Sequence, residues 1–186
     1  MAIKKQWYEI VAPKMFGEKI VGETLAVDPK SLMGRRIDIS LMEISRNYSQ
    51  FYIKLSLKVE KIEGNRAFTR FMGHDIMRER VYRMVQRHGR RIDVVQDVTT
   101  KDGVKLRMKT VFMLIRRVGT STKNSARAFA RELIDEIVKE KSFEELMEMI
   151  IKGEMQMQLK RKCSKIYPVG NMEIRKTDIL ENSIAA

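Results

Sequence analysis

The side chains with the clearest chemical potential are arginines that recur at helical spacing. The apolar residues between them predict a helix over residues 76–88, ended by Gly89 as a C-cap. The residues expected to face the core are Met77, Val81, Met84 and Val85. A guanidinium group binds phosphate oxygens through two parallel hydrogen bonds, so we interpret the opposite face as a phosphate-binding surface. Its members are Arg78, Arg80, Arg83 and Arg87, and Arg90 and Arg91 extend it beyond the cap.

A second group of cations alternates along a predicted strand. Residues 92–99 and 104–118 have the pattern of two strands, and the Asp-Gly pair at residues 102–103 is a strong hairpin signal. Lys105, Arg107 and Lys109 then project from one face of the second strand. Like charges this close repel one another, which indicates an anion lying across them. Arg116 and Arg117 are expected to close this strand.

A third group lies where residues 119–127 lead into a helix predicted over residues 124–141. Helix N-termini favour acidic residues, but Lys123, Arg127 and Arg131 all precede the first acid of this helix. This placement of cations at the start of the helix becomes favourable if a phosphate binds at the helix N-terminus. The hydroxyl donors would be Thr120, Ser121, Thr122 and Ser125. An ordinary Ser or Asn N-cap is the alternative.

These three groups account for an uneven distribution of charge. The chain has 186 residues and a formal net charge of +13. Residues 66–131 contain 17 Lys+Arg against 5 Asp+Glu and therefore carry +12 of it. So concentrated a positive field favours a polyanionic partner, and nucleic acid is the commonest one. A solvated basic face kept for solubility is the alternative, but it does not explain the unevenness.

Enzyme motifs are absent from the sequence. Two histidines cannot build a histidine metal cluster, and there is no P-loop, dinucleotide fingerprint or Cys-x-x-Cys pair. Asp93, Asp97 and Lys105 could mimic a metal-dependent nuclease, although acids scattered beside a basic hairpin are common. These observations predict no metal and no cofactor, and they disfavour a nuclease.

The elements that must position these groups follow from changes in hydrophobic period. Residues 19–27, 35–41, 51–60 and 66–72 read as strands, which predicts a small antiparallel sheet or barrel. A helix, the hairpin, two to three helices and a strand over residues 169–179 follow. A capping box opens at Ser142, and Gly153 separates helices ending near residues 152 and 165. The fold class is α+β, with a β-rich part over residues 1–73 and a mixed part over residues 74–186.

The second part has the element order of one form of KH domain. That family clamps nucleic acid with a Gly-x-x-Gly loop, which is missing from Lys139-Glu140-Lys141-Ser142. A single cysteine, Cys163, excludes an internal disulfide and is typical of a structural thiol in a reducing cytosol. With no signal-peptide core at the N-terminus and no apolar run of ~18 residues, a cytoplasmic protein without a membrane partner is expected.

Short motifs spread in order over almost the whole chain carry a family resemblance. They are Lys5-Gln6-Trp7-Tyr8, Val11-Ala12-Pro13-Lys14-Met15-Phe16, Gly34-Arg35-Arg36-Ile37, Phe71-Met72-Gly73-His74-Asp75, Thr99-Thr100-Lys101-Asp102-Gly103 and Ser164-Lys165-Ile166-Tyr167-Pro168. With them, the chain resembles the S-three-A family of small-subunit ribosomal proteins of archaea and eukaryotes, also called the eukaryote-type S-one protein. The absence of a basic tail after Ile179 is similar to archaeal members.

The resemblance implies a non-enzymatic constituent of the small ribosomal subunit, on the platform beside the messenger RNA exit. Its expected partners are the 3′ region of the small-subunit ribosomal RNA, neighbouring small-subunit ribosomal proteins and messenger RNA near the exit. A free RNA-binding regulator of translation is the alternative. Trp7 and Tyr8 match the start of the family, either as a core plug or as a docking surface for RNA or a neighbouring protein.

Overall fold

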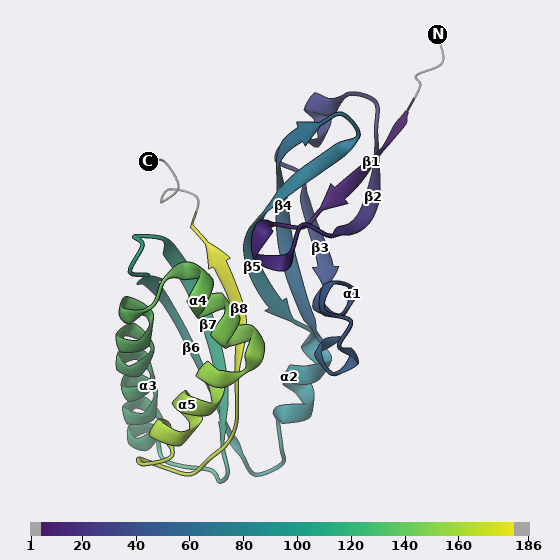
Figure 1. The fold of residues 1–186 in the computed structure, drawn as a ribbon. Coiled ribbons are helices and arrows are strands. Elements are labelled where there is room, and N and C mark those ends of the chain that lie inside the picture. The colour runs from purple at the N-terminus through teal and green to yellow at the C-terminus, as the bar shows by residue number, and fades with distance from the viewer. Residues whose placement is uncertain (1–4, 181–186) are drawn as a thin grey trace. The chain divides into compact units, whose positions relative to one another are not determined.

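The computed structural model describes residues 5–180, and the chain divides into two compact units, Met1–Asp75 and Ile76–Ala186 (Figure 1). The α+β class is confirmed by eight strands and five α-helices among the described residues. The assignment of residues 1–73 and 74–186 to a β-rich and a mixed domain stays a prediction. The expectations about a signal peptide over the first four residues and about a basic tail after residue 180 lie outside the described residues.

The first unit is built on a five-stranded sheet with the strand order β2-β1-β5-β4-β3. Its strands are β1 (Gln6–Val11), β2 (Ile20–Ala26), β3 (Arg36–Ser40), β4 (Ile53–Glu63) and β5 (Arg66–Ile76). Short helical segments connect them, namely η1 (Lys14–Phe16), η2 (Pro29–Leu32), α1 (Leu41–Ser45) and η3 (Tyr48–Gln50). The core comes from alternation in the long strands: Leu55, Leu57 and Ala67 are fully buried, as the period of two requires.

One strand pair of this unit departs from the expected antiparallel sheet. β1 pairs with β5 in parallel through Glu9–Arg66, Ile10–Ala67 and Val11–Phe68, and the sequence analysis did not identify β1 as a strand. Its partner lies 57 residues further along the chain, and a parallel pairing needs a long crossover rather than a turn. β1 also pairs with β2 in antiparallel orientation along its whole length, but η1 lies between the two strands, so the segment carried no short-turn hairpin signal.

The second unit is a three-stranded antiparallel sheet with the order β8-β7-β6. Its elements are α2 (Arg78–Met84), β6 (Arg90–Thr99), β7 (Lys105–Leu114), α3 (Thr120–Glu140), α4 (Phe143–Lys152), α5 (Glu154–Cys163) and β8 (Val169–Ile179). Helices α3, α4 and α5 cover one face of this sheet (Figure 1). The core between them contains fully buried Phe112 from β7, Ile134 from α3 and Leu159 from α5.

Helix α2 is shorter than predicted, because it ends at Met84 instead of His88. Val85 turns to an extended conformation with ψ 105° and is 46% exposed, so it does not face the core. Gly89 is therefore not a helix cap. A Cβ atom there would lie 3.0 Å from the Cε atom of Met113 and 3.1 Å from the carbonyl oxygen of Leu114. Gly89 lets the chain pass close to the end of β7 as it enters β6.

Two further boundaries differ, and both concern the segment between β7 and α3. The strand ends at Leu114 rather than Val118, which places Arg116 and Arg117 in a loop. The helix begins at Thr120 rather than Asn124. The hydroxyl residues expected before the helix therefore form its first turn.

The predicted signals around α4 are confirmed. The hydroxyl of Ser142 accepts a hydrogen bond from the backbone N–H of Glu145, whose carboxylate accepts one from the N–H of Ser142. Gly153 ends α4 in the left-handed conformation at φ 82°, where glycine carries no steric cost. Cys163 is buried at the end of α5, and burial raises the pKa of its thiol to about 11. Such a thiol is a packing residue rather than a nucleophile.

Candidate nucleic-acid interface

The arginines of α2 do not all have the same surroundings. The guanidinium of Arg80 donates two hydrogen bonds, at 2.9 and 3.2 Å, to one carboxylate oxygen of Glu173 on β8. Arg78 and Arg83 are exposed on the helix, and Arg87 is exposed in the turn that follows it. Among the described residues, none of these three has an ion pair. They are therefore available to an anion, whereas Arg80 holds α2 against the sheet.

An exposed tyrosine lies among these arginines and was missed by the sequence analysis. Tyr82 is 67% exposed and follows Arg78 by four residues, which places the two side chains on one side of α2. The buried side of the same helix is made by Val81 and Met84, each 4% exposed. An aromatic residue outside the apolar stripe and one turn from an arginine was the available signal.

The three cations of β7 share one face, as predicted, but acids separate them. Arg107 lies opposite Asp97 of β6 on one side and opposite Asp178 of β8 on the other. Its guanidinium binds both carboxylate oxygens of Asp97, at 2.7 and 2.8 Å. This bidentate hydrogen bond lowers the pKa of the Asp97 carboxyl below its ordinary value. The repulsion that was taken to indicate an external anion is thus relieved within the sheet.

Lys105 and Lys109 flank this ion pair along the strand. Lys105 lies near the hairpin turn, opposite Thr99, whereas Lys109 lies opposite Lys176 of β8, which pairs with Asp178 at 3.0 Å. On the other face of β7, Leu106 and Met108 are fully buried. The alternation was therefore predicted correctly, although the charge of the face is mixed.

The N-terminus of α3 has no side-chain cap. Gly119 is the N-cap residue and the first turn contains no acid, so its backbone N–H groups lack a compensating charge. Thr120, Ser121 and Ser125 are exposed, and Lys123 is half-buried. Arg127 is held by the sheet, because its Nε donates to the carbonyl oxygen of Asp93 at 3.2 Å. Arg131 is exposed one turn further on.

Strand register brings several of these cations to one end of the second unit. Arg90 at the start of β6 lies opposite Leu114 at the end of β7, and Val169 at the start of β8 lies opposite the same residue. The loop after β7, the first turn of α3 and the turn before β6 therefore meet at this end. We call it, together with the last turn of α2 that leads into the turn before β6, the basic end. Its cations are Arg83, Arg87, Arg90, Arg91, Arg116, Arg117 and Lys123.

The cations at the basic end differ in whether they already bind another group of the protein. Arg91 donates two hydrogen bonds to Asp93, at 2.7 and 3.1 Å, and Arg90 is half-buried with an unpartnered Nε. Arg116 and Arg117 are exposed in the loop, and among the described residues neither has an ion pair.

The last turn of α5 adds cations that the sequence analysis did not include. Ser164, directly after this helix, accepts a hydrogen bond from the backbone N–H of Val169, and Pro168 accepts one from Ile115. These contacts tie the end of α5 to the end of the sheet where the basic end lies. The exposed cations there are Lys160, Arg161, Lys162 and Lys165. Their run in the sequence was the available signal, although cations also stabilise a helix C-terminus by themselves.

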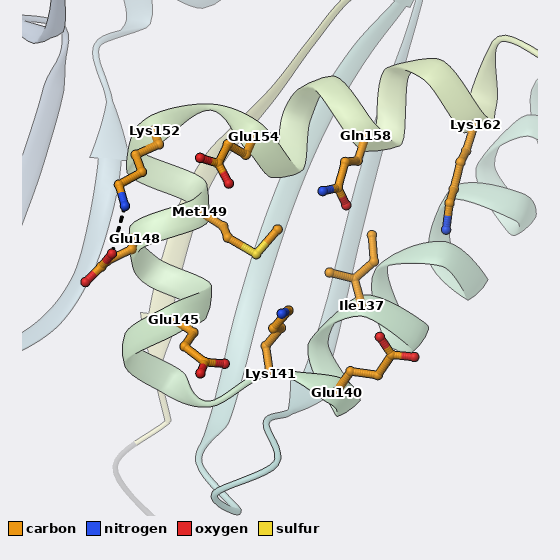
Figure 2. A pocket seen from close by; sticks show the side chains of 10 residues that line it. All are labelled: Ile137, Glu140, Lys141, Glu145, Glu148, Met149, Lys152, Glu154, Gln158 and Lys162. Carbon is orange, nitrogen blue, oxygen red and sulfur yellow. Dashed lines mark hydrogen bonds and ion pairs between the residues drawn. The ribbon is translucent and has the colours of Figure 1, made fainter.

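A groove of about 460 Å³ on the same unit has a different character (Figure 2). It lies between α3, α4 and α5, and Met149 points into it. Its rim carries the carboxylates of Glu140, Glu145, Glu148 and Glu154. Lys152 is bound to Glu148 at 2.9 Å, and this hydrogen bond raises the pKa of Lys152. Lys141, Lys152 and Lys162 also line the groove, so its charge is mixed, with one carboxylate in excess. We therefore do not assign the groove to the basic surface.

The acids of the nuclease hypothesis are engaged elsewhere. Asp97 binds Arg107, and Asp93 binds Arg91. Within residues 5–180, no group of three or more His, Cys, Asp or Glu side chains is arranged to hold a metal ion. No helix in that part of the chain is long and apolar enough to cross a membrane.

The fold and the surface define a basic α+β protein whose exposed chemistry is dominated by arginine and lysine. A sequence model of the ribosomal S3Ae family matches residues 2–183, and the chain belongs to this family. The resemblance carried by the short motifs is thereby confirmed. Members of the family are structural components of the ribosome and not enzymes.

Curated relatives extend over nearly the whole chain. It is 37% identical over 178 residues to the small ribosomal subunit protein eS1 of Methanothermobacter thermautotrophicus, covering 96% of this chain and 91% of the relative. The protein of the same name from Methanothrix thermoacetophila is 35% identical and covers 95% and 83%, respectively. That from Sulfurisphaera tokodaii is 34% identical and covers 95% and 92%.

Proposed function

We propose that this protein is a structural constituent of the small ribosomal subunit that holds folded ribosomal RNA through the basic end of its second unit. The observation that carries the RNA-binding surface is the set of exposed arginines without ion pairs among the described residues, at Arg83, Arg87, Arg116 and Arg117. The family and its curated relatives support the ribosomal role.

Phosphate contacts supply the affinity in this proposal. Each Lys or Arg that neutralises a phosphate releases condensed counterions, so binding weakens as salt increases. The uncapped first turn of α3, with Thr120 and Ser121, offers N–H and hydroxyl donors to one further phosphate. Contacts to the backbone and to the shape of the RNA dominate over base reading.

Tyr82 adds one contact of a different kind. An exposed ring beside Arg78 can stack on an unpaired base while the guanidinium binds the adjacent phosphate. The cations of β7 contribute less, because Arg107 is already bound to Asp97.

The finer expectations from the family resemblance belong to the same proposal. They are location in the ribosome of the cytoplasm, contact with the 3′ region of the small-subunit RNA, and neighbouring ribosomal proteins and messenger RNA near the exit as partners. Residues at the basic end would contact RNA, and other surfaces would contact proteins.

Sedimentation of a cell lysate through a sucrose gradient tests the ribosomal role. We expect the protein, detected by antibody, to co-sediment with small subunits and to bind isolated short RNAs weakly. An Arg83/Arg87/Arg117→Ala variant should shift toward the top of the gradient at raised salt. The Lys101/Lys139/Lys152→Ala variant removes the same charge elsewhere and serves as the control. Tight binding to short RNAs with no small-subunit fraction would instead indicate a free regulator of translation.

A further inference from the structure

The only tryptophan of the chain is exposed on the sheet of the first unit. Trp7 on β1 is 61% exposed, whereas the next residue, Tyr8, is 2% exposed and packs in a buried cluster with Ala26 and Leu32. Because side chains alternate along a strand, burying Tyr8 forces Trp7 to the opposite face. The two residues that the sequence analysis treated together therefore have different roles.

Trp7 is part of a small apolar patch. It lies directly opposite Leu25 of β2, which is 37% exposed, and Val27 just beyond β2 is 42% exposed. Arg35 holds this edge of the sheet, since its Nη1 donates to the Thr24 hydroxyl at 2.7 Å and to the carbonyl oxygen of Leu25 at 3.4 Å. The patch therefore lies on two strands that are already held in place. A partner that binds it does not have to offset the entropy lost by ordering a flexible segment.

The charges beside the patch are unlike those of the basic end. Glu9 and Glu23 lie directly opposite each other, on the same face as Trp7 and Leu25. Glu9 is bound by Arg66 at 3.2 Å, whereas Glu23 is exposed and has no ion pair among the described residues. Three cations lie beside these two glutamates, namely Lys5, Arg35 and Arg66, so the edge carries an excess of one positive charge. The guanidinium of Arg35 is bound to Thr24 and Leu25 and that of Arg66 to Glu9. The free carboxylate of Glu23 next to Leu25 repels a phosphate backbone and attracts a cation.

We propose that Trp7, Leu25 and Glu23 form a docking site for an extended segment of a neighbouring protein that combines an apolar side chain with a lysine or arginine. The apolar side chain packs on Trp7 and Leu25, and the cation binds the carboxylate of Glu23. Large aromatic residues that are exposed in the free chain and rigidly held are the typical anchors of protein interfaces. The identity of the partner as a small-subunit protein rests on the proposed function.

Because the chain contains one tryptophan, its fluorescence reports on this patch alone. The full chain, labelled with 7-azatryptophan so that it can be excited apart from other proteins, is mixed first with protein-free small-subunit RNA. The total protein of small subunits is added next. We expect no change of emission with RNA alone, and a blue shift with protection from acrylamide quenching once the proteins are present. A Glu23→Lys variant should lose at least half of that protection, whereas Glu18→Lys on the same unit should keep it.

Three results would overturn the proposal. A shift with protein-free RNA would make RNA the occupant, a shift of the chain alone at rising concentration would indicate a second copy, and an unchanged emission in every mixture would leave the patch without a partner. RNA binding is measured in the same samples by filter retention. Loss of retention with an intact protein-dependent shift would contradict the RNA-binding function and leave the docking site standing.

Discussion

Arg80 and Arg83 lie three residues apart on α2 and have different roles. Arg80 binds Glu173, which is 13% exposed, so its guanidinium supplies the compensating charge of a mostly buried carboxylate. Arg83 is exposed and has no ion pair among the described residues. The same residue type therefore stabilises the fold at one position and is available to RNA at the other.

Separate alanine variants test this difference. Arg80→Ala should lower the free energy of unfolding by about 1 kcal/mol, because it leaves Glu173 without its cation. Arg83→Ala should leave stability within about 0.5 kcal/mol and reduce the slope of log affinity against log salt by about 1. Urea denaturation and RNA filter binding measure the two effects. Equal losses of stability in both variants would contradict the assignment.

The Asp97–Arg107 pair limits what the β7 face contributes. Replacing Asp97 by Asn should free Arg107 and raise RNA affinity at neutral pH, with a steeper salt dependence. A fall in affinity would show instead that the ion pair positions this face.

The same pair makes a small, pH-dependent contribution to stability. The hydrogen bond from Arg107 lowers the pKa of Asp97 below 3.8 in the folded protein. Its stabilisation is therefore present above that value and lost as the pH falls through the lowered pKa. The stability difference between the wild type and Asp97→Asn should accordingly shrink below about pH 4 in urea titrations. A difference that does not change with pH would contradict this linkage.

At the scale of elements, the first turn of α3 lacks a side-chain cap and an acidic residue, which costs stability, and it is also the proposed docking site of a phosphate. A Ser121→Glu substitution should stabilise the helix by about 0.3–1 kcal/mol, because an acid there compensates the macrodipole. The same substitution should weaken RNA binding, since it places a carboxylate where a phosphate is proposed to dock. Thermal unfolding and filter binding measure both effects, and Ser121→Ala controls for loss of the hydroxyl. Higher stability with unchanged affinity would remove this turn from the interface.

The capping box at the start of α4 has a purely structural role. Ser142→Ala should lower stability by about 1 kcal/mol, because the backbone N–H of Glu145 in the first turn loses its acceptor, the Ser142 hydroxyl. RNA affinity should not change, since the start of α4 is bonded to Asp102 in the β6–β7 turn, at the opposite end of the sheet from the basic end. Differential scanning calorimetry together with the binding assay checks this, and a parallel loss of affinity would place α4 at the RNA interface.

Most elements could be predicted because their signals are local. The Asp-Gly pair predicted the β6–β7 hairpin, and the strand pattern of residues 169–179 predicted β8. Ser142 and Gly153 predicted the two ends of α4. Helix α2 was extended too far because its apolar spacing continues to Val85, whereas the close approach of Gly89 to β7 decides where the chain must turn. β1 was missed because η1, and not a two-residue turn, connects it to its antiparallel partner β2, and because its parallel partner β5 is distant in the sequence.

The candidate site was predictable in composition but not in arrangement. Periodicity identified Arg83, Lys105 and Arg107 as outward-facing, and the structure agrees. That Asp97 and Asp178 flank Arg107 depends on the register of three strands, which no local pattern contains. Whether the predicted residues bind RNA stays a prediction.

At the scale of the whole molecule, surfaces of different charge are segregated. The second unit gathers arginines at the basic end, whereas four glutamates and three lysines line its groove. The first unit carries an apolar patch at Trp7 with the free carboxylate of Glu23 beside it. This segregation is what a protein that contacts RNA and other proteins through different surfaces requires, because only one of them should attract phosphate.

The salt dependence of binding to small-subunit ribosomal RNA tests the central claim most directly. The slope of log affinity against log salt should fall by about 2 to 3 in the Arg83/Arg87/Arg117→Ala variant, because each lost phosphate contact removes about 0.7 to 0.9. The Lys101/Lys139/Lys152→Ala variant, which loses the same net charge away from the basic end, should keep a slope close to that of the wild type. Equal slopes in the two variants would contradict the claim that the basic end binds the RNA.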